Sequence, residues 1–426
     1  MRKIRINICG YDSPVHNGGP LQWLMRMPHE LRERCFDCRI LLFAWAPAMD
    51  CLAYRHLTNA GFTVSFTLFR DTISNIRWLL DECAADMPQV FIANHVVPAL
   101  YAASFLRDAG VATVGVIRSD DDFYDSIIDQ FIANKSRFNL TSVICVSDFL
   151  CDKVRLLNTI NPLLCRTIPS GATVPSSCAV APDGFFHALY VGRLVHKQKR
   201  VLDLVKALEG AKKSIPALTA DLIGDGEARL EIEHYLDSRK INWIRLRGSL
   251  CEKEVIRAML VSHCLVLLSD YEGAPMAVME AMACGLPSVC LKIRSGIADL
   301  ILHGQTGIIV ADREASFASA IATLAEDADL WTRLSHGARQ RAEIGFSVQV
   351  CADKWAALLV EIAPPDIPAP LRAPLRFRLP PPLPGFAHQD LRPVSFFYSL
   401  RRRVKERARF YKVKFEGFCA KFCFQW

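Results

Sequence analysis

The 426-residue sequence has no long hydrophobic run, no excess of acidic residues and no internal repeat. None of its apolar stretches approaches the roughly 18 to 20 residues that a membrane-spanning helix needs. The basic start MRKIRINICG is not followed by the apolar core of a signal peptide, so we interpret it as a first buried strand. Hydrophobic residues make up 51% and charged residues 22%, which excludes a largely disordered chain and suffices for two or three domains.

Cysteines are abundant, but a paired cysteine framework is missing. The 16 cysteines are scattered singly, and several, such as Cys9, Cys145 and Cys264, lie inside apolar runs. Cys35 and Cys38 form the only CxxC pair, and no second pair or histidine cluster completes a metal site, so we interpret the pair as structural. So many unpaired thiols favour a reducing compartment, and we predict a cytoplasmic protein.

The net charge of +7 is concentrated near the C-terminal end. Residues 364–426 hold 13 Lys and Arg against four acids, whereas the remaining chain holds 38 against 40. The first part of this segment, residues 364–393, contains ten of the 23 prolines, which exclude a helix or a central strand. Its last part contains aromatic residues interleaved with Lys and Arg. We expect residues 394–426 to lie on an anionic membrane surface, in preference to packing on the body or a partner. Nucleic acid is not expected, because no known binding module surrounds the segment.

Short apolar strands alternate with helical segments along the rest of the chain, which predicts parallel sheets covered by helices. The first series of expected strands is Ile4–Cys9, Arg39–Ala44, Thr63–Leu68, Val90–Ala93, Ala112–Ile117 and Ser142–Val146. The second is His187–Val191, Leu218–Ile223, Ile244–Arg247, Cys264–Ser269, Ser288–Leu291 and Gly307–Val310. We therefore predict two α/β domains, 1–174 and 187–363, with a linker at 175–186 and a tail at 364–426.

Ligands of such sheets bind where strands end and helices begin, which directs attention to SDYEGAPMAVMEAMACGLP, residues 269–287. Pro275 suits the start of a helix, and Gly285 with Pro287 suits its end. Glu272 then lies in the loop before the helix, and Glu280 lies inside an otherwise apolar helix. A buried carboxylate needs hydrogen-bond donors, which either ligand hydroxyls or a neighbouring arginine can supply.

Basic residues follow the first strand of the second series, in GRLVHKQKR. Arg193 and Lys199 flank a loop between Gly192 and a helix, which makes a good pocket for a diphosphate. Lys197 and Arg200 can equally be solvated. Glycines at three further positions, Gly18 and Gly19 after the first strand and Gly224 in IGDG, allow close backbone approach to a phosphate or a plain tight turn.

Together these segments resemble family 4 of the retaining glycosyltransferases. The resemblance covers roughly residues 1–362, is strongest over 187–310, and rests on the Glu-x7-Glu arrangement of Glu272 and Glu280. It is supported by GRLVHKQK, LIGDG, RSGIADLILHGQTGIIV, VSDFL and IPSGATV. It implies the GT-B fold, in which two Rossmann-like domains face a cleft with the donor mostly on the second domain and the acceptor on the first.

The resemblance also implies donor-side roles. Arg193 and Lys199 would hold the nucleotide diphosphate, Glu280 the ribose, and Glu272 the transferred sugar. The backbone of Gly273, Ala274, Pro275 and Met276 would bind the sugar hydroxyls. It implies no metal or other cofactor, and the sequence agrees, since no Asp-x-Asp follows a strand of the second series.

The chain departs from the family at two positions. Arg200 stands where a glycine usually follows the lysine, so it either alters the loop or adds a phosphate contact. Arg118 stands where many relatives have histidine, which leaves His95 as the better catalytic candidate, or else as a structural histidine. Acceptor-side candidates are His16, Asn94, Arg118, Asp120 and Asp121, although the two acids can instead cap a helix.

From these features we predict a retaining, metal-independent hexosyltransferase acting in cell-surface polysaccharide synthesis. It would move a sugar from a nucleotide-sugar to a glycan or lipid-linked glycan, in the cytoplasm or on the inner face of the membrane. Two other interpretations stay open. One is a GT-B nucleotide-sugar epimerase, and the other is a non-catalytic nucleotide-sugar-binding scaffold.

Overall fold

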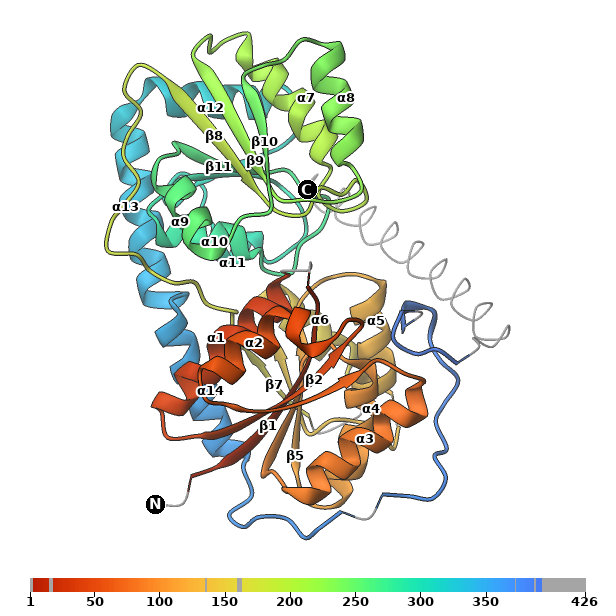
Figure 1. The fold of residues 1–426 in the computed structure, drawn as a ribbon. Helices are drawn as coiled ribbons and strands as arrows, with labels where there is room; N and C mark the ends of the chain where they lie inside the picture. Colours follow the sequence, from red (N-terminus) through yellow and green to blue (C-terminus); the bar gives the residue numbers. More distant parts are fainter. Residues whose placement is uncertain are drawn as a thin grey trace, which may run out of the picture.

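A computed structural model describes residues 3–14, 18–134, 136–158, 163–371, 373–386 and 388–392. It contains two α/β domains, one above the other in Figure 1, and each has a parallel sheet flanked by helices. The predicted membrane-binding segment 394–426 and the candidate His16 lie outside the described residues.

The N-terminal domain is built on seven parallel strands in the order β3-β2-β1-β4-β5-β6-β7. The six predicted strands are confirmed within a few residues. The unpredicted β7 lies at the sheet edge, where its short LCRT sequence carries too little apolar pattern to signal a strand. The strands are β1 (Arg5–Asp12), β2 (Asp37–Ala44), β3 (Thr63–Leu68), β4 (Val90–Ala93), β5 (Ala112–Ile117), β6 (Ser142–Cys145) and β7 (Leu164–Thr167).

Helices connect successive strands, as in a doubly wound sheet. Polar side chains begin three of them, because Asp71, Asp121 and Ser147 accept hydrogen bonds from backbone N–H groups of the first turns of α3, α5 and α6. The helices are α1 (Gly19–Glu33), α2 (Leu52–Asn59), α3 (Thr72–Ala85), α4 (Val97–Asp108), α5 (Asp122–Ile128), followed by a π-helical turn (Asp129–Ala133), and α6 (Asp148–Leu157).

The second domain has six parallel strands in the order β10-β9-β8-β11-β12-β13, and the six predicted strands are confirmed. They are β8 (Phe186–Val191), β9 (Leu218–Ile223), β10 (Ile244–Gly248), β11 (Cys264–Leu267), β12 (Ser288–Leu291) and β13 (Ile308–Val310). Its helices are α7 (Val201–Lys212), α8 (Arg229–Ser238), α9 (Glu252–Leu260), α10 (Met276–Ala283), α11 (Ile297–Leu300), α12 (Ala315–Glu326) and α13 (Ala328–Gly345).

The chain then returns to the N-terminal domain through α14 (Val348–Ile362), which packs against α1 (Figure 1). Trp355 of α14 lies against Trp23 of α1, with ring centroids 5.1 Å apart and both rings buried. We had expected 187–363 to belong to the second domain. The correction follows from the apolar face of α14, which is buried in the core of the first domain.

The two chain crossings between the domains lie side by side. Ala172 on the first crossing donates its N–H to the Phe346 carbonyl at 2.8 Å, and Val348 on the second donates to the Ala172 carbonyl at 3.0 Å. A Cβ on Gly171 would lie 3.0 Å from the Val348 Cα, so the crossings touch through their backbones. This pair of segments forms the hinge between the domains.

Residues 364–392, which we call the C-terminal strap, run along the N-terminal domain (blue in Figure 1). Their described part has neither an α-helix nor a strand, as the prolines predicted, and contains one 3₁₀ turn at Pro384–Phe386. Leu383 and Phe386 are buried in the core of the domain. The segment that we expected to begin a separate tail is therefore a packed part of the first domain.

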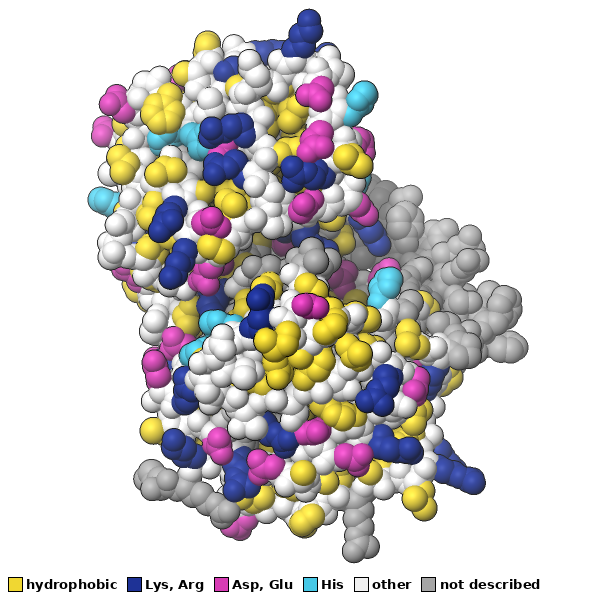
Figure 2. Space-filling model, viewed as in Figure 1, with side chains coloured by type: hydrophobic (Ala, Val, Ile, Leu, Met, Phe, Trp, Pro, Cys, Tyr) yellow, Lys and Arg dark blue, Asp and Glu magenta, His cyan; other side chains and the backbone are white. Residues whose placement is uncertain are grey.

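Both signs of charge are interspersed over the visible face of the two domains (Figure 2), as expected for the nearly neutral body. Among the residues that the structure describes, none of the helices combines the length and the apolar composition needed to cross a bilayer.

Candidate active site

The loops at the carboxyl ends of the two sheets meet at the junction of the domains. A Cβ on Gly273, in the loop before α10, would lie 2.0 Å from the Arg118 carbonyl oxygen after β5. Next to this contact, a Cβ on Gly19 would lie 3.5 Å from Cγ of Met276. The predicted donor-binding loop therefore touches two of the predicted N-terminal segments, and only glycine fits at Gly273.

Lys199 and Glu272 form an ion pair at this junction. Their Nζ and Oε1 atoms lie 2.5 Å apart, and their side chains are only 13% and 6% exposed. Gln198 ties the same two loops together, because its Nε2 donates to the Tyr271 carbonyl at 3.1 Å. Lys199 follows β8 and Glu272 follows β11, so these two neighbouring strands bring a cation and an acid into direct contact.

Arg193 belongs to the same group and also acts on the opposite domain. Its Nη2 donates to Oε1 of Gln198 at 2.7 Å. Its positive charge opposes the rise that burial causes in the pKa of Tyr11, at the end of β1. It also contributes to the low pKa of His95. The charge of Arg193 in the second domain therefore acts on two side chains of the first domain.

Arg118 is a buried cation held by neutral groups. Its guanidinium donates to Oδ1 of Asn94 at 3.0 and 2.9 Å and to Oγ of Ser170 at 2.9 Å, and it lies over the Trp23 ring. Burial lowers the pKa of Arg118 to about 10. Because these partners do not neutralise its charge, the site favours an anion.

Asn94, which accepts hydrogen bonds from Arg118, also fixes the start of α1. Its Nδ2 donates to the Pro20 carbonyl at 3.0 Å. Gly18 precedes this helix and accepts hydrogen bonds from the Leu21 and Gln22 N–H groups. The predicted candidates Asn94, Arg118 and Gly18 are thus linked through the start of α1.

His95 lies in a cage of aromatic rings, and its Nδ1 is 2.7 Å from the Tyr124 hydroxyl. The rings of Tyr11, Phe123 and Tyr124 surround it at centroid distances of 4.4 to 5.4 Å. Burial, with the charges of Arg118 and Arg193, lowers the pKa of His95 to about 3. The imidazole is therefore neutral near pH 7 and acts through hydrogen bonds, because a group with this pKa is a poor proton acceptor.

Glu280 lies inside α10 as predicted, but its side chain is half-buried, with 18% of its surface exposed. Burial raises its pKa to about 7, with Glu252 adding to the rise and Arg26 opposing it. Arg26 of α1 approaches Glu280 with 3.8 Å between Nη2 and Oε1. None of the three guanidinium nitrogens of Arg26 has a hydrogen-bond partner among the described residues. The expected neighbouring arginine is present, but it leaves the Glu280 carboxylate without a close donor.

Asp120 and Asp121 make structural contacts. Asp121 accepts from the Phe123 and Tyr124 N–H groups, both at 3.1 Å, and so caps α5. Helix capping was one of the two roles that the sequence left open for this residue. Asp120 is ion-paired with Lys153. Both carboxylates therefore have partners within the N-terminal domain.

The glycines at the ends of β8 and β9 pack backbone against backbone. Gly224 has a φ of 134°, and a Cβ there would lie 1.9 Å from the Gly192 carbonyl oxygen. A side chain at Gly224 would therefore displace the loop that carries Arg193.

Arg200 occupies a left-handed backbone conformation, with φ of 52°, immediately before α7. Glycine adopts this conformation most easily, which accounts for the glycine usual in the resembling family. Its guanidinium pairs with Asp203 at 2.7 Å and with Asp270 at 3.6 Å. The loop is therefore kept in the conformation that glycine favours, and the arginine is held by acids of its own domain.

Three further side chains at the junction carried little signal in the sequence. Tyr11 and Tyr124 line the His95 ring, and Arg26 faces Glu280. Tyr11 is the one that the strand-end rule could have found, because it stands near the end of β1. Arg26 lies in the middle of a helix with other charged residues, where nothing distinguishes it from a solvated cation.

Three buried thiols form a group of possible metal ligands that the sequence reading missed. The sulfur atoms of Cys145, Cys151 and Cys165 lie within 4.8 Å of one another, and those of Cys151 and Cys165 are 3.0 Å apart. They come from β6, α6 and β7, so no short spacing motif links them.

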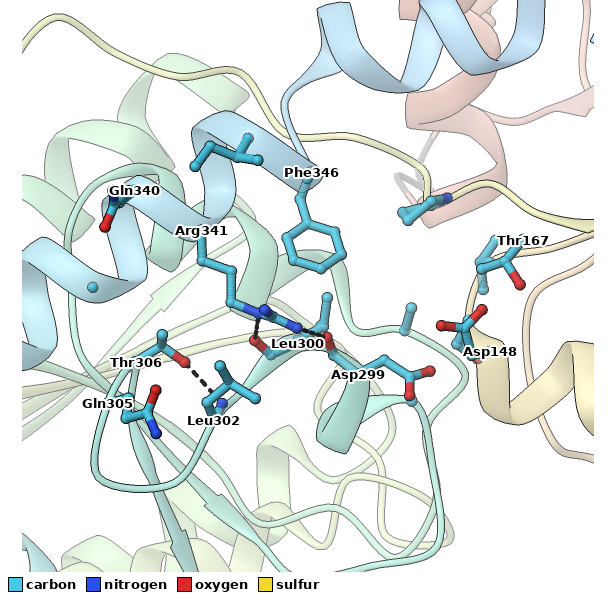
Figure 3. A pocket seen from close by; sticks show the side chains of 18 of the residues that line it. Asp148, Thr167, Asp299, Leu300, Leu302, Gln305, Thr306, Gln340, Arg341 and Phe346 are labelled. Atoms are coloured by element: carbon cyan, nitrogen blue, oxygen red, sulfur yellow. Dashed lines mark hydrogen bonds between the residues drawn. The ribbon is translucent and has the colours of Figure 1, made fainter. Parts of the chain in front are cut away.

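A cavity of about 640 Å³ opens between the domains beside α13 (Figure 3). Arg341 spans one wall and donates to the Leu300 and Asp299 carbonyls at 2.8 and 2.7 Å, while Asp148 lies on the opposite wall. Of the predicted site residues that the structure describes, Ala274 alone lines it. Neither Lys199 nor Glu272 lines this cavity.

Comparison with known sequences agrees with this geometry. Residues 180–341 match the model of the family described as glycosyl transferases group 1. A glycogen synthase of Mycobacterium tuberculosis is 31% identical over 170 residues, which are 39% of this chain and 41% of that protein. The putative colanic acid biosynthesis glycosyltransferase WcaL of Salmonella typhimurium is 24% identical over 337 residues, 72% of this chain and 80% of that one. The chain thus spans about two fifths of the first of these relatives.

Solved structures resemble the whole two-domain body. The pneumococcal O-GlcNAc transferase GtfA, in complex with UDP and GlcNAc, superposes with a TM-score of 0.70 over 85% of this chain and 99% of that one, at 13% identity. Anabaena Alr3699/HepE, in complex with UDP-glucose, gives a TM-score of 0.67 over 84% and 100%, at 19% identity. These similarities show the fold, which is the GT-B fold that the motifs predicted.

Proposed function

We propose that this chain is a glycosyltransferase that moves a sugar from a nucleotide-sugar donor to a glycan or lipid-linked glycan acceptor. The observation that carries the proposal is the convergence of Arg193, Lys199 and Glu272 with Arg118 at the junction of two Rossmann-like domains. The match of residues 180–341 to a glycosyltransferase family supports it, because that region contains the whole predicted donor motif.

On the donor side, the diphosphate would lie between Arg193 and Lys199. Binding would replace the contact of Lys199 with Glu272, and the freed carboxylate would accept a hydroxyl of the sugar. Glu280, which has no close donor in the described structure, would accept the ribose hydroxyls. The backbone from Gly273 to Met276 would orient the sugar ring beside the N-terminal domain.

The reaction would retain the configuration of the transferred hexose. The acceptor hydroxyl attacks the anomeric carbon on the face that the diphosphate leaves, the bond between that carbon and the phosphate oxygen breaks, and the hydroxyl proton passes to the departing diphosphate. His95 would orient the acceptor by hydrogen bonding, because its low pKa makes it a weak base. Arg193 and Lys199 would stabilise the departing charge, so we expect no metal requirement.

The cellular setting belongs to the same proposal. Residues 394–426 would hold the enzyme on the inner, anionic face of a membrane, where lipid-linked acceptors are presented. The cysteines of the described residues are unpaired, which supports the proposed cytoplasmic location. We infer a role in cell-surface polysaccharide synthesis.

The test is a thermal-shift panel of UDP-, GDP- and ADP-sugars on the full chain, followed by transfer assays with the stabilising donor. Arg193→Ala should abolish the donor-dependent shift, because it removes a diphosphate ligand. Lys197→Ala, an exposed cation of the same loop, is the matched control and should behave like the wild type. A nucleotide-sugar epimerase would convert the donor without an acceptor, and a scaffold would bind it without turnover. Equal donor shifts in both variants would contradict the proposed site.

A further inference from the structure

The C-terminal strap makes a direct contact with the predicted acceptor-side histidine. Gln389 is buried, and its side chain bonds to the backbone on both sides of one turn. Its Nε2 donates to the His95 carbonyl at 3.1 Å, and its Oε1 accepts from the Val97 N–H at 2.8 Å. Gln389 therefore satisfies two backbone groups that would otherwise be buried without partners.

The turn that Gln389 holds is conformationally unusual. His95 has a φ of 63°, in the left-handed region that residues with a side chain rarely adopt. Such a conformation persists only where the surroundings over-determine it. The two hydrogen bonds from Gln389 are part of what holds it, and they fix the direction in which the His95 side chain leaves the backbone.

The strap also packs on the helix that carries the hydrogen-bond partner of this imidazole. Phe386 is fully buried, with its ring centroid 5.9 Å from that of Phe123 and 6.0 Å from that of Phe131. A Cβ on Gly385 would lie 2.3 Å from the Asp122 carbonyl oxygen. Helix α5 presents Tyr124 to His95, so the strap touches both elements that orient the ring.

Polar anchors fix the strap next to Gln389. Asp390 is buried and accepts from Oγ1 of Thr72 at 2.8 Å. Arg392 pairs with Asp390 at 2.5 Å and lies over the ring of Tyr101. The position of Gln389 is therefore set by contacts with α3 and α4, independently of the acceptor.

From these contacts we propose that Gln389 is a positioning residue for His95, so that the strap forms part of the acceptor side of the active site. The inference rests on the proposed function for its catalytic consequence. Its structural part stands on the contacts alone. It assigns a role to a segment that lies outside both the matched family region and the motif resemblance.

The first arm of the test uses hydrogen exchange on the full chain. Gln389→Ala removes the acceptor of the Val97 N–H, so exchange of the amides of residues 95–97 should become at least tenfold faster. Leu375→Ala is the matched control, because Leu375 belongs to the same strap and is 95% exposed. Unchanged exchange in Gln389→Ala would overturn the proposal without involving any assay of activity.

The second arm measures transfer with the donor and acceptor varied separately. Gln389→Ala should lower kcat/KM for the acceptor by on the order of tenfold to a hundredfold, as expected for a misplaced active-site group. The donor-dependent thermal shift should stay as in the wild type. Faster exchange with unchanged acceptor kinetics would mean a merely structural role and would overturn the proposal. Absence of transfer by the wild-type chain would instead contradict the proposed function.

The pH dependence of acceptor kcat/KM in Gln389→Glu tests the hydrogen bond itself, because a residue that only fills space would give no such dependence. A protonated carboxyl can still donate to the His95 carbonyl, whereas an ionised one repels it. Acceptor kcat/KM of this variant, divided by that of the wild type, should therefore fall as the pH rises. The other titratable neighbours are His95, Asp390 and Arg392, together with Tyr124 beside His95 and Tyr101 beside Arg392. The wild type carries all of these groups, so dividing by the wild-type value removes their contribution. A ratio that does not depend on pH would overturn the proposal.

Discussion

Lys199 and Glu272 neutralise each other in a nearly buried pair, so we expect a change of one of them alone to lower stability, in addition to the loss of transfer that the proposed function predicts. Lys199→Met should lower the free energy of unfolding by about 3 to 5 kcal/mol, because it leaves the Glu272 carboxylate buried without a partner. Adding Glu272→Gln should recover most of this loss without restoring transfer. Urea unfolding and transfer assays on both variants check this.

The neighbouring pair of Arg200 and Asp203 is the control for that experiment. Its side chains are much more exposed, and Arg200→Ala should change the free energy of unfolding by at most about 1 kcal/mol. A double variant as unstable as Lys199→Met would show that the buried charge is not the cause.

Glu280 gives the chain a pH-dependent stability. Burial raises the pKa of its carboxyl to about 7, so the folded state holds the proton more tightly than the unfolded chain does. The stabilisation is complete below the ordinary pKa of a glutamate and is lost as the pH rises through 7. Glu280→Gln cannot ionise, and it should match the wild type near pH 4 and exceed it by about 1 to 3 kcal/mol at pH 8. Denaturant unfolding at the two pH values measures this, and a difference independent of pH would contradict it.

Individual residues differed in how far the sequence could place them. Arg193, Lys199 and Glu272 follow strand ends in characteristic motifs, and parallel strands bring their ends to one edge of a sheet, so their grouping was predictable. Gln389 could not be found in this way. It meets His95 across 294 positions of the chain, and no local pattern encodes such a contact.

At the scale of elements, the loop between β11 and α10 is fitted against the opposite domain. In Gly273→Ala the new Cβ would collide with the backbone oxygen of Arg118, and backbone cannot move aside as a flexible side chain can. We expect the two domains to be held apart and kcat/KM for transfer to fall on the order of a hundredfold. Steady-state kinetics, with small-angle scattering to follow the domain separation, test this.

Gly210→Ala, inside α7, is the matched glycine control for the loop variant. A Cβ there meets nothing within 4 Å, so this substitution should leave transfer unchanged and slightly raise stability. Turnover by Gly273→Ala at the wild-type rate would show that the loop tolerates the displacement.

Whole elements were more predictable than their partners. Twelve strands follow from β-branched and apolar runs, whereas β7 is too short and polar to stand out. The helical period of α14 is evident in its sequence, but it does not say which domain the apolar face meets. Prolines correctly excluded regular structure from the strap, yet they gave no sign that Leu383 and Phe386 would enter a core.

For the molecule as a whole, the membrane hypothesis needs a truncation that spares the strap. A chain ending at residue 392 loses only the basic-aromatic segment, whereas one ending at residue 363 also loses core residues of the N-terminal domain. We expect the full chain to float with anionic liposomes and the chain ending at 392 to remain in the soluble fraction.

Neutral liposomes and added salt are the controls for flotation, since attraction between charges weakens in both. Transfer to a water-soluble acceptor should be the same for the two chains. Equal flotation of both would remove the case for the segment.

The return of α14 and the strap to the first domain sets an order of events during synthesis. A ribosome makes the seven strands of that domain first, yet Trp355, Leu383 and Phe386 of the same core are among the last described residues to emerge. Until then, Trp23 lacks its partner ring, and the turn at His95 lacks Gln389. The second domain, whose core is continuous in sequence, can complete its folding first. The N-terminal side of the domain junction is therefore complete only after the second domain has been made, because the turn at His95 must wait for Gln389 to leave the ribosome.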